Sequence, residues 1–265
     1  MRRKKWFVTA VAIGMLISGC KKEQTAEAPP PEQPKAEAPA APKAETPAPA
    51  AAQPEVTASA PVATSKSGYD RALLRAALLK EQAPGTFQVR FATSRGDFTA
   101  TVHRDWAPIG ADRFYNLVKH HFYDNASFFR VVPGFVVQFG ISAYPAVSAA
   151  WENANIKDEP VKESNKRGYL TYAKTTMPDT RSTQIFVNLK DNAGLDAQGF
   201  SPFGVVDGPG MKVVDMMYDQ YSESSGPDQD QISKLGKPYL DKGWPKLDSI
   251  KSATLVGAAP AAAKP

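Results

Sequence analysis

The stretch "FFRVVPGFVVQFG", residues 128–140, is the part of this chain that decides its fold and its site. It is an apolar run that contains one permanently charged side chain, Arg130, and one amide, Gln138, at its far end. The arginine either points to solvent from a half-buried strand or acts on a ligand inside an apolar cleft. The first interpretation is the better one for an isolated arginine, so other parts of the sequence have to decide between them.

Residues 1–20 have the layout of a bacterial secretion signal. The basic "MRRKK" precedes the apolar "WFVTAVAIGMLISG" and the only cysteine, Cys20. The apolar stretch is short for a membrane span. "LISGC" resembles the lipobox of lipoproteins, which implies cleavage before Cys20 and lipidation of that residue; an uncleaved membrane anchor is the alternative. Lysine at position 21 implies sorting to the outer membrane, so we expect a lipid-anchored protein of the cell envelope that faces the periplasm.

The formal net charge of +5 comes mostly from the signal. Cleavage removes four positive charges, those of Arg2, Arg3, Lys4 and Lys5, and so leaves the mature chain near +1. A charge this small gives no electrostatic reason to expect nucleic-acid binding. Lipidation of Cys20 leaves no cysteine for a disulfide, so the exported domain has to be stabilised by its core.

Composition divides the chain into five segments. Alanine and proline dominate residues 20–66, where large apolar side chains are nearly absent, so this segment cannot offset its ordering entropy and is expected to be a disordered linker. In residues 67–84, four apolar residues at helical spacing predict an amphipathic helix. The segments are a signal peptide at 1–19, the lipidated cysteine and linker at 20–66, the helix at 67–84, a globular domain at 85–256 and a disordered tail at 257–265.

The sequence of the globular part predicts many short strands and two helices. Alternating apolar and polar residues on either side of "SRG" predict a hairpin, and other short apolar runs bounded by turn residues predict further strands. Helical spacing predicts one helix over 107–124 and another over 211–221. Strands are predicted at 87–93, 97–103, 168–174, 183–189, 202–206 and 250–256. This pattern favours a closed or nearly closed antiparallel barrel.

The residue types needed for nucleophilic, metal or redox chemistry are poorly represented. His120 and His121 are adjacent on a predicted helix and point in different directions, so they cannot share one site. Four acidic residues could be imagined as a catalytic pair, but their loop-like surroundings favour solvated turn residues: Asp158, Glu159, Asp191 and Asp196. We therefore expect no metal and no cofactor.

Four motifs occur in one order: "FFRVVPGFVVQFG", "KRGYLTYAK", "TRSTQIFVNLKDNAGLD" and "FSPFG". Together they resemble the cyclophilin-type peptidyl-prolyl cis–trans isomerases, from about residue 85 to residue 256. The resemblance implies a mainly β fold, a closed eight-stranded antiparallel barrel capped by two α-helices. It implies an enzyme that rotates X-Pro bonds, and with the lipobox its expected substrates are unfolded or partly folded proline-containing proteins of the envelope.

The resemblance also assigns roles to residues. Arg130 matches the catalytic arginine and Gln138 the glutamine that positions the substrate backbone, which favours the ligand-facing interpretation of the arginine. Phe139 replaces a common glycine and predicts a bulkier groove edge, while residues 141–165 and 222–247 are longer than in compact members. The remaining matches are the proline-pocket wall and its neighbours, with Phe200 placed only approximately: Phe135, Val136, Ala173, Gln184, Phe186, Leu195 and Phe200.

Two other functions fit parts of the sequence. A non-catalytic peptide-binding module or holdase chaperone could use the same fold, although Arg130 and Gln138 argue for the enzyme. A structural lipoprotein tethered to the cell wall is supported only by the linker. We expect a monomer that contacts the membrane through its lipid and does not bind nucleic acid.

Overall fold

The computed structural model describes residues 68–221 and 223–257. The predicted signal peptide, Cys20, the linker and all but the first residue of the predicted tail lie outside the described residues. Within the part that the structure describes, no helix is long and apolar enough to cross a bilayer.

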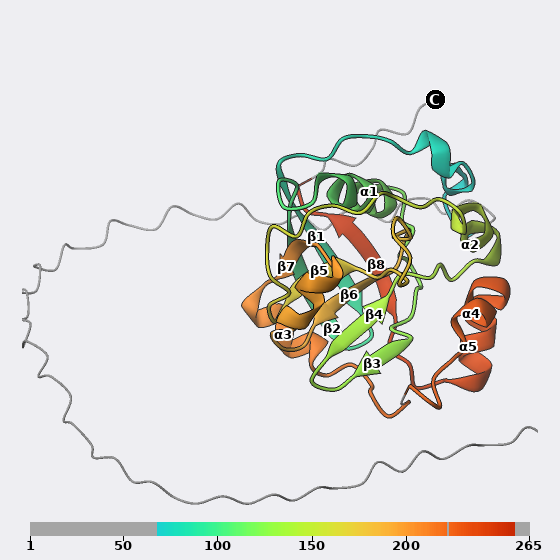
Figure 1. Ribbon diagram of the computed structural model, residues 1–265. Helices are drawn as coiled ribbons and strands as arrows, with labels where there is room; N and C mark the ends of the chain where they lie inside the picture. Colours follow the sequence, from blue (N-terminus) through green and yellow to red (C-terminus); the bar gives the residue numbers. More distant parts are fainter. Residues whose placement is uncertain (1–67, 222, 258–265) are drawn as a thin grey trace, which may run out of the picture. The chain divides into compact units, whose positions relative to one another are not determined.

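Eight antiparallel strands form one sheet, in the order β3-β4-β6-β5-β7-β2-β1-β8. The mainly β prediction is therefore confirmed, and each strand predicted from the sequence is present (Figure 1). The strands are β1 (Thr86–Thr93), β2 (Gly96–His103), β3 (Arg130–Val132), β4 (Val136–Phe139), β5 (Tyr169–Tyr172), β6 (Ile185–Asn188), β7 (Pro202–Val206) and β8 (Ile250–Leu255).

The sheet is an open half-barrel, so the expectation of a closed barrel is not confirmed. Strands β3 and β8 lie at its two ends, and the segments just before them meet at one isolated bridge between Ser127 and Ser249. In this antiparallel register β8 lies opposite the residues before Ser127 and not opposite β3, and the turn at Asn125, with a φ of 62°, ends the extended backbone there.

One predicted helix is present over most of its length, and the other is present only in part, because α3 (Gly208–Val214) shares residues 211–214 with the predicted 211–221 and residues 215–221 are not helical. Helix α1 (Pro108–Lys119) lies across one end of the sheet in Figure 1. Helix α3 packs on β2. Proline in the first turn begins both helices, as its fixed φ and missing N–H favour.

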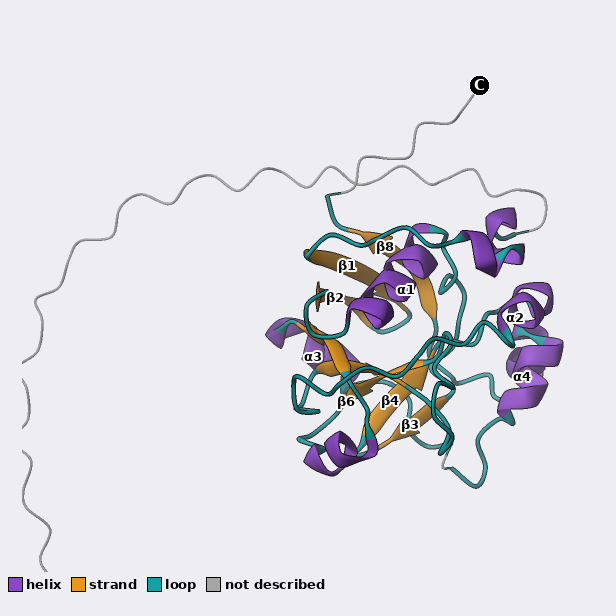
Figure 2. Ribbon diagram, turned by 45° about the horizontal axis from the view of Figure 1, so that its top comes forward, coloured by secondary structure: helices purple, strands orange, loops and turns teal. Residues whose placement is uncertain are grey.

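Three further helices make the predicted count of two too small. They are α2 (Pro145–Trp151), α4 (Gln229–Leu235) and α5 (Lys237–Gly243), and α2 packs against α4 beside the sheet (Figures 1 and 2). Each has seven residues. Two turns are too few for a periodic apolar pattern to stand out in sequence, so tertiary packing forms these helices.

The predicted amphipathic helix at 67–84 is wrong. The described part of this segment contains two 3₁₀ helices, η1 (Arg71–Leu74) and η2 (Ala76–Leu78). Leu73 is buried and its carbonyl accepts a hydrogen bond of 2.8 Å from Trp151 Nε1, whereas Leu78 is exposed. The segment is held on the domain by such single contacts and not by a continuous apolar face, which an α-helix here would need.

Alternation along β4 separates the core from the site. Val137 and Phe139 face the main core, where Phe139 packs edge-on against Phe128 at 5.1 Å between ring centroids. Val136 and Gln138 lie on the opposite face of the strand. The bulkier groove edge expected from Phe139 is therefore wrong, because the period of two directs this side chain inward.

A tight approach of two strands follows directly after β4. Gly140 has a φ of 108°, and a side chain there would place its Cβ 2.5 Å from the carbonyl oxygen of Thr183. Only glycine fits this conformation and this spacing. Gly140 therefore lets β4 leave the sheet beside β6, the strand that carries Phe186.

Candidate active site

Arg130 and Gln138 face one another across the β3–β4 pair. Arg130 Nη1 donates a hydrogen bond of 3.1 Å to Gln138 Oε1, and Gln138 Nε2 donates one of 2.8 Å to Gln184 Oε1. The turn between the strands is short, so residues eight apart in sequence become direct neighbours. The result is a fixed row of three polar side chains that begins at the arginine.

Aromatic and aliphatic side chains lie beside this row. The ring of Phe135 lies 5.8 Å from the guanidinium carbon of Arg130. Phe186 is opposite Gln138 in the β4–β6 register, and its ring meets that of Phe200 edge-on at 5.9 Å between centroids. Val136 lies on the same face of β4 as Gln138. The predicted wall residues thus place apolar rings along the row, with Phe135 beside Arg130 and Phe186 beside Gln138.

The remaining predicted residues join this group through the backbone. The N–H of Ala173 donates to the carbonyl of Gln184 at 2.9 Å, which continues the pairing beyond β5 and β6. Leu195 lies on η3 (Ala193–Gln198), and its carbonyl accepts a hydrogen bond of 3.2 Å from the N–H of Phe200.

Sequence reasoning missed the residues that hold this wall in place. Asn165 is fully buried, and its Nδ2 donates to Asp196 Oδ1 at 2.7 Å and to the Phe200 carbonyl at 2.8 Å. Burial alone would raise the pKa of Asp196, but hydrogen bonds from Ser164 and Asn165 outweigh it and lower that pKa. Asn165 therefore connects both Leu195's helix and Phe200 to the sheet. A single asparagine in a loop forms no sequence pattern from which this role could be predicted.

A second missed residue contacts the arginine itself. Glu223 Oε1 accepts from Arg130 Nε at 2.9 Å and also from Nη2. The two residues are 93 positions apart, so no local pattern could have paired them. Because Gln138 takes Nη1 and Glu223 takes Nε and Nη2, the guanidinium plane is fixed on both sides.

The loop carboxylates considered as solvated turn residues are in part structural. Glu159 is buried, accepts from the N–H groups of Ile109 and Gly110 at 2.6 and 3.0 Å, and pairs with Arg181 at 3.0 Å. The turn interpretation is wrong for Glu159, because tertiary packing brings the start of α1 and an arginine onto it. Among the described residues, no group of three His, Cys, Asp or Glu side chains could hold a metal ion.

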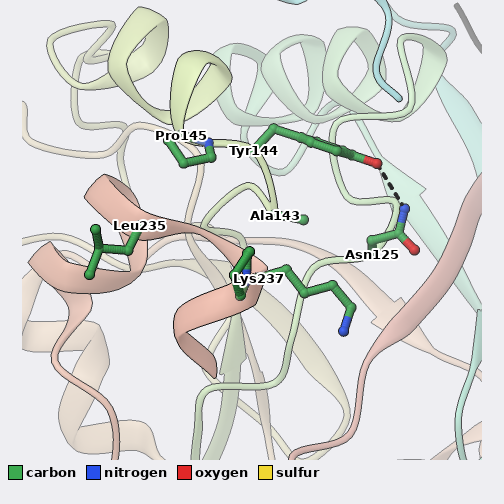
Figure 3. A pocket seen from close by; sticks show the side chains of 7 residues that line it. Asn125, Ala143, Tyr144, Pro145, Leu235 and Lys237 are labelled. Carbon is green, nitrogen blue, oxygen red and sulfur yellow. Dashed lines mark hydrogen bonds between the residues drawn. The ribbon is translucent and has the colours of Figure 1, made fainter. Parts of the chain in front are cut away.

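A cavity of about 520 Å³ lies outside the candidate site, between the start of α2 and the α4–α5 turn (Figure 3). Asn125 Nδ2 donates to Tyr144 Oη across it at 3.1 Å, and its one ionisable amine is that of Lys237. Its lining contains none of the predicted site residues: Asn125, Ala143, Tyr144, Pro145, Leu235, Lys237 and Pro238.

Comparison with known proteins identifies the family of the chain. Residues 88–237 match the family model described as cyclophilin type peptidyl-prolyl cis-trans isomerase/CLD. A peptidyl-prolyl cis-trans isomerase of Acinetobacter baylyi is 35% identical over 52% of this chain and 75% of its own length. Peptidyl-prolyl cis-trans isomerase B of Escherichia coli is 34% identical over 54% of this chain and 90% of its own length. A Cryptosporidium parvum cyclophilin crystal structure is similar at 18% identity and a TM-score of 0.48, over 66% of this chain and 99% of that one.

The chain belongs to the cyclophilin-type peptidyl-prolyl cis–trans isomerase family, since the family model covers more than half of it. It is accordingly an enzyme that interconverts the cis and trans forms of the peptide bond before proline. This confirms the family and the activity expected from the four motifs.

Proposed function

We propose that Arg130 is the catalytic donor of this isomerase and that Gln138 positions the substrate. Rotation about a peptide bond has a barrier of ~18–20 kcal/mol because the C–N bond is conjugated. Twisting the bond localises a lone pair on the prolyl nitrogen, and a donor aimed at that atom stabilises the twisted state more than either planar state. No covalent bond is made or broken, so no nucleophile is needed.

One observation carries this proposal: a guanidinium held by Gln138 and Glu223 beside the ring of Phe135. The Arg130 side chain is 28% exposed, so a peptide can reach it from solvent. Phe135, Phe186 and Phe200 offer an apolar surface for the proline ring, while Gln138 offers a polar contact for the backbone. Arginine suits the task because it stays charged and its donors are rigid.

The activity test uses the full chain in detergent and an Ala-Pro peptide whose cis-to-trans exchange is followed by NMR. We expect strong acceleration by the native chain and its collapse in Arg130→Ala. An Arg130→Ala variant that remains as active as the native chain would overturn the assignment of the arginine. Client binding that persists in an inactive variant would separate catalysis from a holdase role.

We further propose that the substrates are unfolded or partly folded exported proteins and that the enzyme acts as a monomer in the cell envelope. The support is the sequence of residues 1–66: a basic and apolar signal, a lipobox at Cys20, and an Ala/Pro-rich linker that would give the domain reach. Several acyl chains on one cysteine anchor a protein stably, at ~0.8 kcal/mol per buried CH₂.

The localisation test is fractionation of cells that express the chain in the presence of labelled palmitate. Label in the native chain and its loss in Cys20→Ser, together with release of Cys20→Ser from the membrane fraction, are the expected results. Membrane retention of unlabelled Cys20→Ser would instead favour an uncleaved apolar anchor.

A further inference from the structure

We propose that Glu223 is a specificity-determining residue of this enzyme, one that favours clients with a basic residue next to the proline and disfavours those with an acidic one. The proposal rests on the assignment of Arg130 as the substrate-facing donor. Glu223 belongs to none of the four motifs that define the site in sequence.

The segment that carries Glu223 is held in place on both sides. Before it, the ring of Tyr221 meets that of Tyr218 edge-on at 5.0 Å. After it, the carbonyl of Ser225 accepts a hydrogen bond of 2.8 Å from Trp244 Nε1, and Asp228 caps α4. These contacts flank the segment, and Glu223 itself is placed at the edge of the guanidinium by its hydrogen bonds from Arg130 Nε and Nη2.

The hydrogen bonds from Arg130 to Glu223 and Gln138 leave part of the guanidinium free to donate to a substrate. Arginine has five N–H donors, and Nε with Nη2 forms one edge of the plane. Glu223 takes that edge through one oxygen, and Gln138 takes one donor of Nη1. Two of the five donors, one on Nη1 and one on Nη2, are not used by these contacts and are available for a prolyl nitrogen. The geometry fits a residue that lies beside the bound peptide and does not occupy its place.

A small cavity on this side of the arginine gives the neighbouring client residue a place to lie. It has a volume of about 160 Å³. Its lining includes the acid, the arginine and uncharged residues: Phe129, Arg130, Tyr221, Glu223, Gly226, Pro227 and Gln229. Among the described residues that line this cavity, Glu223 carries the one carboxylate, and a peptide bound at Arg130 thus passes next to it.

Charge gives this arrangement its selectivity. Arg130 alone would attract acidic peptides, and the carboxylate of Glu223 cancels that attraction. Glu223 is 61% exposed, against 28% for the arginine, so it is the more accessible charge for an incoming side chain. A partly exposed ion pair contributes modestly, and it weakens as salt screens it.

The experiment measures kcat/KM by NMR exchange for the full chain with peptides that carry Lys, Gln or Glu at one position before or after an Ala-Pro pair. At one of the two positions we expect kcat/KM to fall in the order Lys, Gln, Glu. The Lys peptide should be about five- to tenfold above the Glu peptide, because attraction of the lysine and repulsion of the glutamate by Glu223 add. Glu223→Gln should remove this preference. Salt raised from about 0.01 to 0.5 M should reduce it in the native chain.

The matched control is Glu152→Gln, which makes the same change at an exposed acid on the first residue after α2. It should keep the native order. An order that is the same in Glu223→Gln and in the native chain would overturn the proposal. An equal rise of kcat/KM for all three peptides in Glu223→Gln would also overturn it, because Glu223 would then only compete with substrate for Arg130. Arg130→Ala in the same series tests the catalytic assignment separately, through the neutral peptide.

Discussion

Two arginine–glutamate pairs in this protein have the same chemistry and opposite surroundings. Arg181 and Glu159 are 1% and 5% exposed, and they tie the start of α1 to the loops around residues 159 and 181. Arg130 and Glu223 are 28% and 61% exposed, and the arginine lies beside the ring of Phe135. A buried pair has no water to replace a lost partner, whereas an exposed pair can exchange its partner for substrate. Burial therefore makes one pair structural and leaves the other free for chemistry.

The largest expected effect breaks the buried pair. Arg181→Met leaves the carboxylate of Glu159 buried without its partner, so we expect the free energy of unfolding to fall by about 3–5 kcal/mol. Urea unfolding followed by circular dichroism measures it. A double variant, Arg181→Met with Glu159→Gln, should recover part of the loss, because the buried charge of Glu159 is removed while an amide oxygen still accepts from an N–H at the start of α1. A single variant as stable as the native chain would show that the Arg181–Glu159 pair does not stabilise the fold.

The same substitution at the exposed pair should act on rate instead. For Arg130→Met we expect kcat/KM with an Ala-Pro peptide to fall about 10²–10³-fold, the usual loss when an oriented donor is removed. The free energy of unfolding should change by less than about 1 kcal/mol, because the pair is exposed. A stability loss as large as that of Arg181→Met would end the contrast between the two pairs.

An intermediate effect is expected at Asn165, which supports the pocket wall from beneath. Asn165→Ala leaves the Phe200 carbonyl without its side-chain donor and removes one of the hydrogen bonds to Asp196, so stability should fall by about 1–3 kcal/mol. A displaced wall should raise KM more than it lowers kcat. Asn153→Ala, the same change at an exposed position, is the control and should leave both quantities unchanged. Equal effects of the two variants would remove Asn165 from the site.

The smallest effect is a pH dependence far from the site. A hydrogen bond to Asp124 raises the pKa of His121 above its ordinary value of 6.5, in spite of partial burial. A raised pKa in the folded state means that this stabilisation is complete below pH 6.5 and is lost as pH rises through the folded value. We expect less than about 1 kcal/mol.

His121→Asn tests this dependence, since asparagine tolerates the φ of 59° at this position. The difference in unfolding free energy between the native chain and the variant should shrink as pH rises from about 6 to about 8. A difference that stays constant over this range would show that the histidine charge contributes nothing.

Much of the site could be predicted from sequence because it lies on neighbouring strands. Arg130 and Gln138 are eight residues apart across one tight turn, so local geometry alone brings them together. Gln184 and Phe186 follow in the motif of the next strand in the sheet. The inward position of Phe139 also follows from local geometry, because the two-residue period of a strand puts it on the face of β4 opposite to that of Gln138.

The sequence by itself determined the family, the predicted strands, helix α1 and the closeness of Arg130 to Gln138, since these depend on short-range periodicity and on motifs. Only the tertiary structure decided that the sheet stays open between β3 and β8, that residues 71–74 and 76–78 form 3₁₀ helices, and that Glu159 is buried while Glu223 meets the arginine. The physical reason is that burial and ion pairing depend on which distant segments meet. Such long-range contacts leave no periodic trace in the chain.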